Sequence, residues 1–90
     1  MSYHQPAVWT YLNLATRSGH PHAFDLVALR LVPLKDGATF YREERYDIGT
    51  FEPDEKTGRK LWWHGTRGIE DPCKLQKKYE ITWYPVDMPE

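Results

Sequence analysis

Cysteine is nearly absent from this 90-residue chain, because Cys73 is the only one. A single cysteine excludes an intramolecular disulfide, a four-cysteine zinc module and a Cys-x-x-Cys redox pair. The chain also lacks an apolar run of the roughly 20 residues that a membrane helix needs, and residues 1–6 do not resemble a signal peptide. These absences predict a cytoplasmic protein without a membrane partner, whose fold is held by packing.

Charge of one sign is not in excess either. Lysine and arginine number 12 against 13 aspartates and glutamates, for a net charge of −1. A near-neutral chain argues against a protein that binds nucleic acid mainly by neutralising phosphates. Ser2 and Ser18 are the only serines, neither lies in a Gly-x-Ser-x-Gly elbow, and no glycine-rich phosphate loop is present. We therefore expect no catalytic residue and no cofactor.

Aromatic residues are abundant, with four tryptophans, six tyrosines and three phenylalanines. Each buried aromatic side chain hides about 150–250 Å² of surface, so these rings supply the core of a small chain without disulfides. The length predicts a single domain over residues 1–90, with short flexible ends at residues 1–6 and 86–90.

Segments rich in β-branched and aromatic residues indicate a mainly β fold. The segment 24–32 is the most apolar, and Val27, Leu29 and Leu31 share one of its faces. It is predicted to be a central strand buried on both faces, with a short helix ending at Pro33 as the alternative. The predicted strands span residues 7–14, 24–32, 38–48, 61–64 and 79–84.

The strand predicted over residues 38–48 carries charges on both faces, which is typical of an edge strand. Pairing of such edges would make a homodimer, and the alternative is a monomer. A polar loop is expected over residues 52–60. Asp71 followed by Pro72 predicts the start of one short helix near residues 71–78. Together, the predicted strands and helix indicate a β-rich α+β fold, either an antiparallel meander or an open barrel of about five strands.

The sequence contains candidate residues for binding two kinds of ligand, a zinc ion and a single-stranded nucleic acid. A zinc ion would need three imidazoles and a thiolate that only the fold could bring together, because their spacing is not that of a known zinc module. The candidate ligands are His20, His22, His64 and Cys73. A single-stranded nucleic acid could stack on a strand that interleaves aromatic and arginine side chains, although Glu43 and Glu44 interrupt it. The candidate residues are Phe40, Tyr41, Arg42, Arg45 and Tyr46.

Protein binding is the favoured function. Neighbouring residues of a strand point to opposite faces, so Trp62-Trp63 and Trp83-Tyr84 each send one ring to each side of a thin sheet. At least one of these rings is expected at the surface, where Trp, Tyr and Arg commonly anchor interfaces. The expected partner-binding residues are Trp62, Trp63, Trp83 and Tyr84, with Arg42, Arg45 and Tyr46 as a second patch.

The C-terminal part of the chain, over about residues 46–89, resembles a family of small uncharacterised phage and prophage proteins. Their chains end in a strand reading roughly Val-Thr-His-Trp-Met-Pro-Leu-Pro, and the matching stretch here is Ile81–Pro89. Trp62-Trp63 before Gly65 matches the upstream tryptophan of that family, whereas the histidine between its Thr and Trp is missing. The resemblance implies an accessory protein that binds or inhibits a host bacterial protein, including defence machinery, and it transfers no catalytic residue.

Overall fold

The computed structural model describes residues 9–34 and 44–86 of the chain. The predicted flexible ends lie mostly outside these ranges, and so do Phe40, Tyr41 and Arg42. The described part is mainly β with one short α-helix, which confirms the predicted fold class. Its elements are β1 (Thr10–Tyr11), the 3-10 turn η1 (Arg17–Gly19), β2 (Val27–Pro33), β3 (Arg45–Pro53), β4 (Leu61–Gly65), β5 (Gly68–Glu70), α1 (Pro72–Gln76) and β6 (Tyr79–Pro85).

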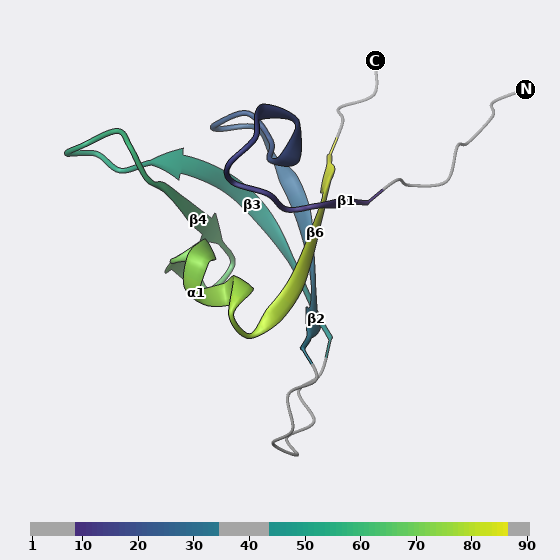
Figure 1. The fold of residues 1–90 in the computed structure, drawn as a ribbon. Coiled ribbons are helices and arrows are strands. Elements are labelled where there is room, and N and C mark those ends of the chain that lie inside the picture. The colour runs from purple at the N-terminus through teal and green to yellow at the C-terminus, as the bar shows by residue number, and fades with distance from the viewer. Residues whose placement is uncertain (1–8, 35–43, 87–90) are drawn as a thin grey trace, which may run out of the picture.

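The strands form one antiparallel sheet in the order β1-β6-β2-β3-β4-β5 (Figure 1). Strands β2 to β5 are a meander, as expected. After α1 the chain crosses back, and β6 pairs with β2 along its whole length rather than with β5. Strand β5 was not predicted, because it has only three residues and is formed by pairing with the end of β4.

Strand β3 connects the two halves of the sheet. It pairs with β2 over residues 45–49 and with β4 over residues 50–53. Gly49 lies where the partner changes, and a Cβ atom there would collide with the backbone carbonyl of His64. β3 lies inside the strand order, so the prediction that residues 38–48 form an edge is wrong for the described part of that segment. The strand also runs on to Pro53, into the predicted loop, because β4 supplies a second hydrogen-bonding partner.

The core lies on one face of the sheet. Val27, Leu29 and Leu31 point into it, as their alternation predicts. The opposite face of β2 is only half-buried, and Phe24 and Leu26 precede the strand with 64% and 42% exposure. The prediction of a strand buried on both faces from residue 24 is therefore corrected. The buried hydrophobic residues are Leu12, Val27, Leu29, Leu31, Phe51, Trp63, Leu75 and Ile81.

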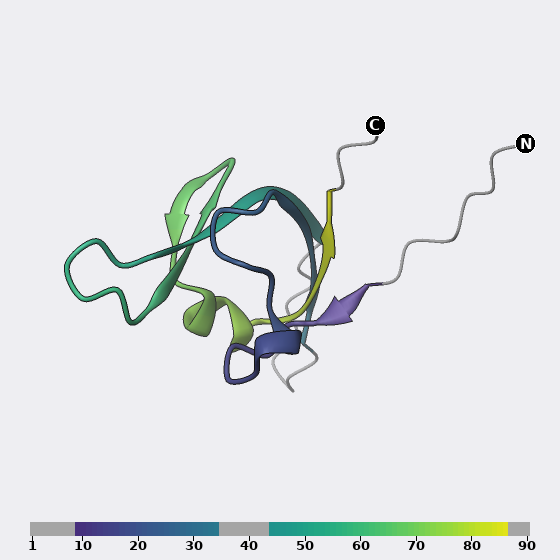
Figure 2. The ribbon, with the colours of Figure 1, turned by 90° about the horizontal axis from the view of Figure 1, so that it is seen from above.

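The helix α1 begins as the sequence predicts. The Asp71 side chain caps it by accepting a hydrogen bond from the Cys73 amide at 3.0 Å, and Pro72 occupies the first turn. Lys60 Nζ lies 2.7 Å from the same carboxylate, and this hydrogen bond holds the pKa of Asp71 below its usual value. Leu75 is buried, so α1 packs against β4 and β6 on the concave side of the sheet (Figure 2). No helix of the described residues has the length and apolarity to cross a membrane.

Candidate functional site

The two neighbouring rings at residues 62 and 63 separate as expected, one to each face of β4. Trp63 pairs in register with Phe51 and is fully buried, with its ring 4.9 Å from the Phe51 ring. Trp62 pairs with Glu52 and stays half-buried on the opposite face. Trp63 therefore belongs to the core and not to a binding surface, which corrects one of the expected partner-binding residues.

The second pair divides in the same way. Trp83 packs against the core, and its Nε1 donates a hydrogen bond to the Gly19 carbonyl at 3.0 Å. This bond ties η1 to β6, so Trp83 helps to hold the turn in place. Tyr84 points to the other side of β6, where its ring centroid lies 5.6 Å from that of Trp9.

Arg45 is not available to a partner or to a phosphate. Its guanidinium is paired with Glu70 and lies 3.3 Å from Asp47, and only 9% of its side chain is exposed. The hydrogen bond to Glu70 raises the pKa of Arg45, so its charge is permanent but internally neutralised. The expectation that Arg45 contacts a partner or nucleic acid is therefore corrected.

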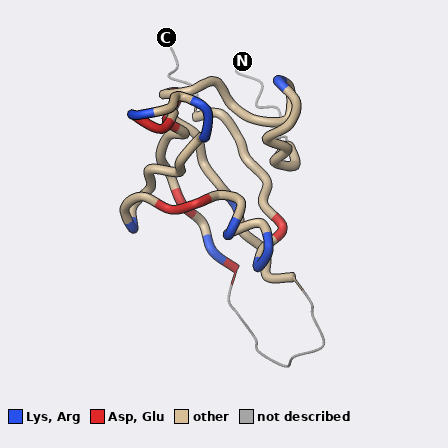
Figure 3. The backbone as a smooth tube through the Cα atoms, turned by 60° about the vertical axis from the view of Figure 1, so that its left-hand side comes forward, with Lys and Arg blue, Asp and Glu red and all other residues tan. Residues whose placement is uncertain are grey.

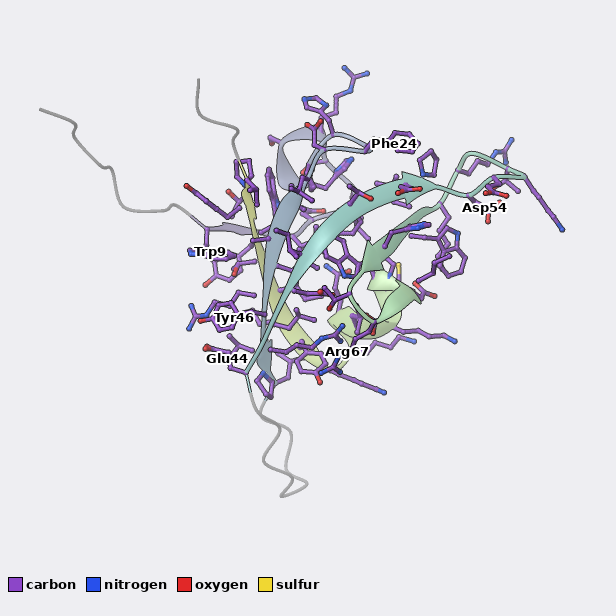
Figure 4. All side chains as sticks on the ribbon, turned by 180° about the vertical axis from the view of Figure 1, so that it is seen from behind. Trp9, Phe24, Glu44, Tyr46, Asp54 and Arg67 are labelled. Atoms are coloured by element: carbon purple, nitrogen blue, oxygen red, sulfur yellow. The ribbon has the colours of Figure 1, made fainter. Side chains whose placement is uncertain are left out.

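The convex side of the sheet carries an exposed group of aromatic side chains. Trp9 is the centre, with Tyr46 at 6.4 Å in an edge-on arrangement and Tyr84 on its other side. Tyr11 and Tyr46 are 65% and 61% exposed. Figure 4 shows Trp9, Tyr46 and Glu44 on the same flank of the molecule. We call this surface the outer face, and its members are Trp9, Tyr11, Arg30, Glu44, Tyr46, Ile48 and Tyr84.

The charges of the outer face neutralise one another. Arg30 pairs with Glu44 at 2.7 Å, and the Tyr46 hydroxyl donates a hydrogen bond to the same carboxylate at 3.0 Å. The hydrogen bond from Arg30, followed by that from Tyr46, lowers the pKa of Glu44. Over the described backbone, cationic and anionic positions are interspersed (Figure 3). The outer face is thus aromatic and nearly uncharged, which suits protein contacts better than phosphate contacts.

Two members of the outer face, Trp9 and Tyr11, were not among the expected binding residues. Their alternation within the predicted strand over residues 7–14 places them on one face. Only the pairing of β1 with β6, in which Thr10 lies opposite Trp83, brings Trp9 beside Tyr84. That contact joins residues at opposite ends of the chain, and local sequence carries no signal for it.

The proposed zinc ligands do not converge. His20 Nδ1 lies 2.7 Å from the Thr16 carbonyl, His64 faces Glu52 at 3.7 Å, and Cys73 is exposed on α1. In the described ranges, no three His, Cys, Asp or Glu side chains are grouped to hold a metal. The four-residue zinc set is therefore corrected, because these residues lie on separate elements.

Phe24 is a residue whose backbone conformation is unfavourable. Its φ angle is +68°, in the left-handed region, and its side chain is 64% exposed. Its amide donates a hydrogen bond of 2.9 Å to the Phe51 carbonyl, which holds the turn against β3. A left-handed conformation costs a residue with a Cβ atom roughly 1–2 kcal/mol.

Replacing Phe24 with glycine is expected to give a more stable protein than replacing it with alanine, by about 1 kcal/mol. Both substitutions remove the exposed ring, but only glycine removes the Cβ atom that opposes the positive φ angle. Urea denaturation followed by circular dichroism measures the difference. An alanine variant as stable as the glycine variant would show that the turn is not strained.

Comparisons with known proteins place this chain in no family. No protein-family model, no curated protein and no solved structure matches the chain.

Proposed function

We propose that this chain is a non-enzymatic protein-binding module that docks a partner on the outer face. The observation that carries the proposal is the exposed cluster around Trp9, in which Tyr46 is 61% exposed. Tyrosine and tryptophan are enriched among the few interface residues that supply most of the binding energy. Their rings remove apolar area from water and keep a polar atom for hydrogen bonding.

The chemistry of the outer face indicates what kind of protein surface would fit it. Ile48, 44% exposed, extends the apolar area along β3. Glu80 is exposed on the same side of the sheet, near the start of β6 and opposite Val32. Arg30 and Glu44 neutralise each other, so Glu80 leaves the rim slightly negative. A complementary partner has an apolar centre with basic residues around it.

The resemblance of the C-terminal part to phage and prophage proteins supports a bacterial host protein as this partner. Accessory proteins of that type commonly act by binding and blocking a host protein, including components of defence systems. Single-stranded nucleic acid is the alternative ligand, because aromatic side chains on an open sheet can stack bases. A protein partner is favoured over nucleic acid, because Arg30 and Arg45 are both paired with carboxylates and are not free to bind phosphates.

Affinity capture from nuclease-treated bacterial lysate, followed by binding measurements with the purified partner, tests this function. The variant is Tyr11→Ala/Tyr46→Ala, and the matched control is Phe24→Ala, which removes an equally exposed ring from another surface. We expect the wild type and the control to bind alike, and the double variant to bind at least about tenfold more weakly. Equal binding by all three proteins would contradict docking on the outer face. Saturable binding of a single-stranded oligonucleotide that is lost in the double variant would show that the outer face binds nucleic acid and not a protein.

A further inference from the structure

A second surface on the convex side is hollowed. It lies over β3, β4 and β5 beside the loop after β3, and its volume is about 440 Å³. Trp62, His64 and Ile69 line it from the strands. Glu52, Asp54 and Glu55 line it from the end of β3 and the loop, together with Lys56. The proposed function does not use this cavity.

The aromatic wall of the cavity is held rigidly. Trp62 Nε1 donates a hydrogen bond of 3.1 Å to Asp54, which fixes the plane of the indole. Lys60 Nζ lies 4.4 Å from the centroid of the Trp62 ring, and its ion pair with Asp71 keeps it there. Lys60 is not part of the cavity lining. The indole thus already attracts one cation, and its remaining surface borders the cavity.

The charge of the cavity is negative. Three carboxylates face one lysine, so the lining carries two net negative charges when His64 is neutral. A backbone hydrogen bond from Thr57, and then the one from Trp62, lower the pKa of Asp54, so it is ionised at neutral pH. Glu52 accepts a hydrogen bond from Thr50 at 2.7 Å, and Glu55 is exposed at the rim. An aromatic wall beside carboxylates is the environment that an organic cation prefers.

We infer that this cavity receives the guanidinium group of an arginine side chain of the partner. This inference rests on the proposed protein-binding function. The planar guanidinium can stack on an indole and donate paired hydrogen bonds to a carboxylate, whereas an ammonium is a point charge. The apolar stem of an arginine would lie against Ile69 and Trp62.

The position of the cavity fits the same partner. Glu52 and Tyr46 point to the same side of β3, because they are an even number of residues apart. Six residues of a strand span roughly 20 Å, which lies within one interface of standard size. The apolar centre of the partner and one of its surrounding basic residues would then contact the outer face and the cavity together.

The side-chain N–H signal of Trp62, followed by nuclear magnetic resonance, tests the inference without the partner. The probe is the blocked tripeptide Gly-Arg-Gly, and the control probe is Gly-Gln-Gly. We expect a saturable shift of the Trp62 signal with the arginine peptide in the millimolar range, and no shift of the Trp9 signal. Glu52→Gln should weaken this binding roughly tenfold. Glu80→Gln, which removes the same charge elsewhere, should leave it unchanged.

An absent shift, an equal shift with the glutamine peptide, or an unchanged affinity in Glu52→Gln would overturn the inference. The two proposals fail separately, because the peptide titration does not involve the outer face. Loss of partner binding in Tyr11→Ala/Tyr46→Ala together with a silent Trp62 signal would reject only the arginine site. A shifted Trp62 signal together with unchanged partner binding in that double variant would reject only docking on the outer face.

Discussion

Replacing Trp63 with alanine is expected to lower the free energy of unfolding by about 3–5 kcal/mol. The ring is fully buried and packs against Phe51, so the substitution leaves a large cavity between β3 and β4. It also removes the donor of the 2.7 Å hydrogen bond to Asp47. A domain of this size has a total stability of about 5–10 kcal/mol, so the variant should be partly unfolded at 37 °C.

Thermal and urea unfolding, followed by circular dichroism, measure this effect. Trp62→Ala is the matched control, because it removes the same side chain from the neighbouring position on the opposite face. Trp63→Phe should fall between the wild type and Trp63→Ala, since it keeps most of the packing but leaves Asp47 without one donor. If Trp63→Ala melted like the wild type, the division of the two rings between core and surface would be incorrect.

Replacing Asp47 with asparagine is expected to lower the stability at neutral pH by about 3–5 kcal/mol, because it breaks a buried charge network. Asp47 is 6% exposed and lies beside Arg45. Its carboxylate accepts hydrogen bonds from Trp63 and from the amide and hydroxyl of Thr66. An asparagine has only one acceptor oxygen and no charge, so it cannot replace these contacts.

The same network explains why a glycine ends β4. A Cβ atom on Gly65 would collide with the Asp47 carboxylate and with Trp63 Nε1. Asp47 thereby fixes the turn that leads from β4 to β5. The effects of Asp47→Asn and Trp63→Phe should be less than additive, because both substitutions remove the same hydrogen bond.

The contribution of Asp47 also depends on pH. Burial alone would raise its pKa, but the hydrogen bonds from Trp63 and Thr66 outweigh this effect and lower the pKa. A carboxylate with a lowered pKa stabilises the fold fully above its unfolded pKa of about 3.9, and the stability is lost as the pH falls through the folded pKa. Urea unfolding between pH 7 and pH 2 should therefore show that the free energy of unfolding falls less on acidification in Asp47→Asn than in the wild type. Asp25→Asn, an exposed control in a turn, should follow the wild type, and identical acid profiles for all three proteins would contradict this role of Asp47.

Much of the local structure was predictable from short-range patterns. The alternation of Val27, Leu29 and Leu31 placed them together on one face of β2, since strand side chains alternate between faces. That the opposite face is only half-buried was not predicted. Asp71 and Pro72 identified the start of α1, because capping and a fixed φ angle act within one turn. The mainly β class followed from the same patterns and is confirmed.

The candidate sites were less predictable. Arg45 and Tyr46 are neighbours and looked equivalent in the sequence, yet Arg45 pairs with Glu70 inside the fold while Tyr46 is exposed. The cavity beside Trp62 depends on where the loop after β3 lies, and no motif marks it. The four candidate zinc ligands of the alternative interpretation are not grouped for the same reason, because spacing alone does not place residues from separate elements together.

The amino-acid sequence by itself determined what depends on neighbours in the chain: the strand faces, the helix cap, and the separation of Trp62 from Trp63. The tertiary structure alone decided what depends on distant pairings. It placed β6 between β1 and β2, which brought Trp9 beside Tyr84 and created the outer face. The physical reason is that a strand offers hydrogen bonds along both edges, and global packing selects the partner of each edge.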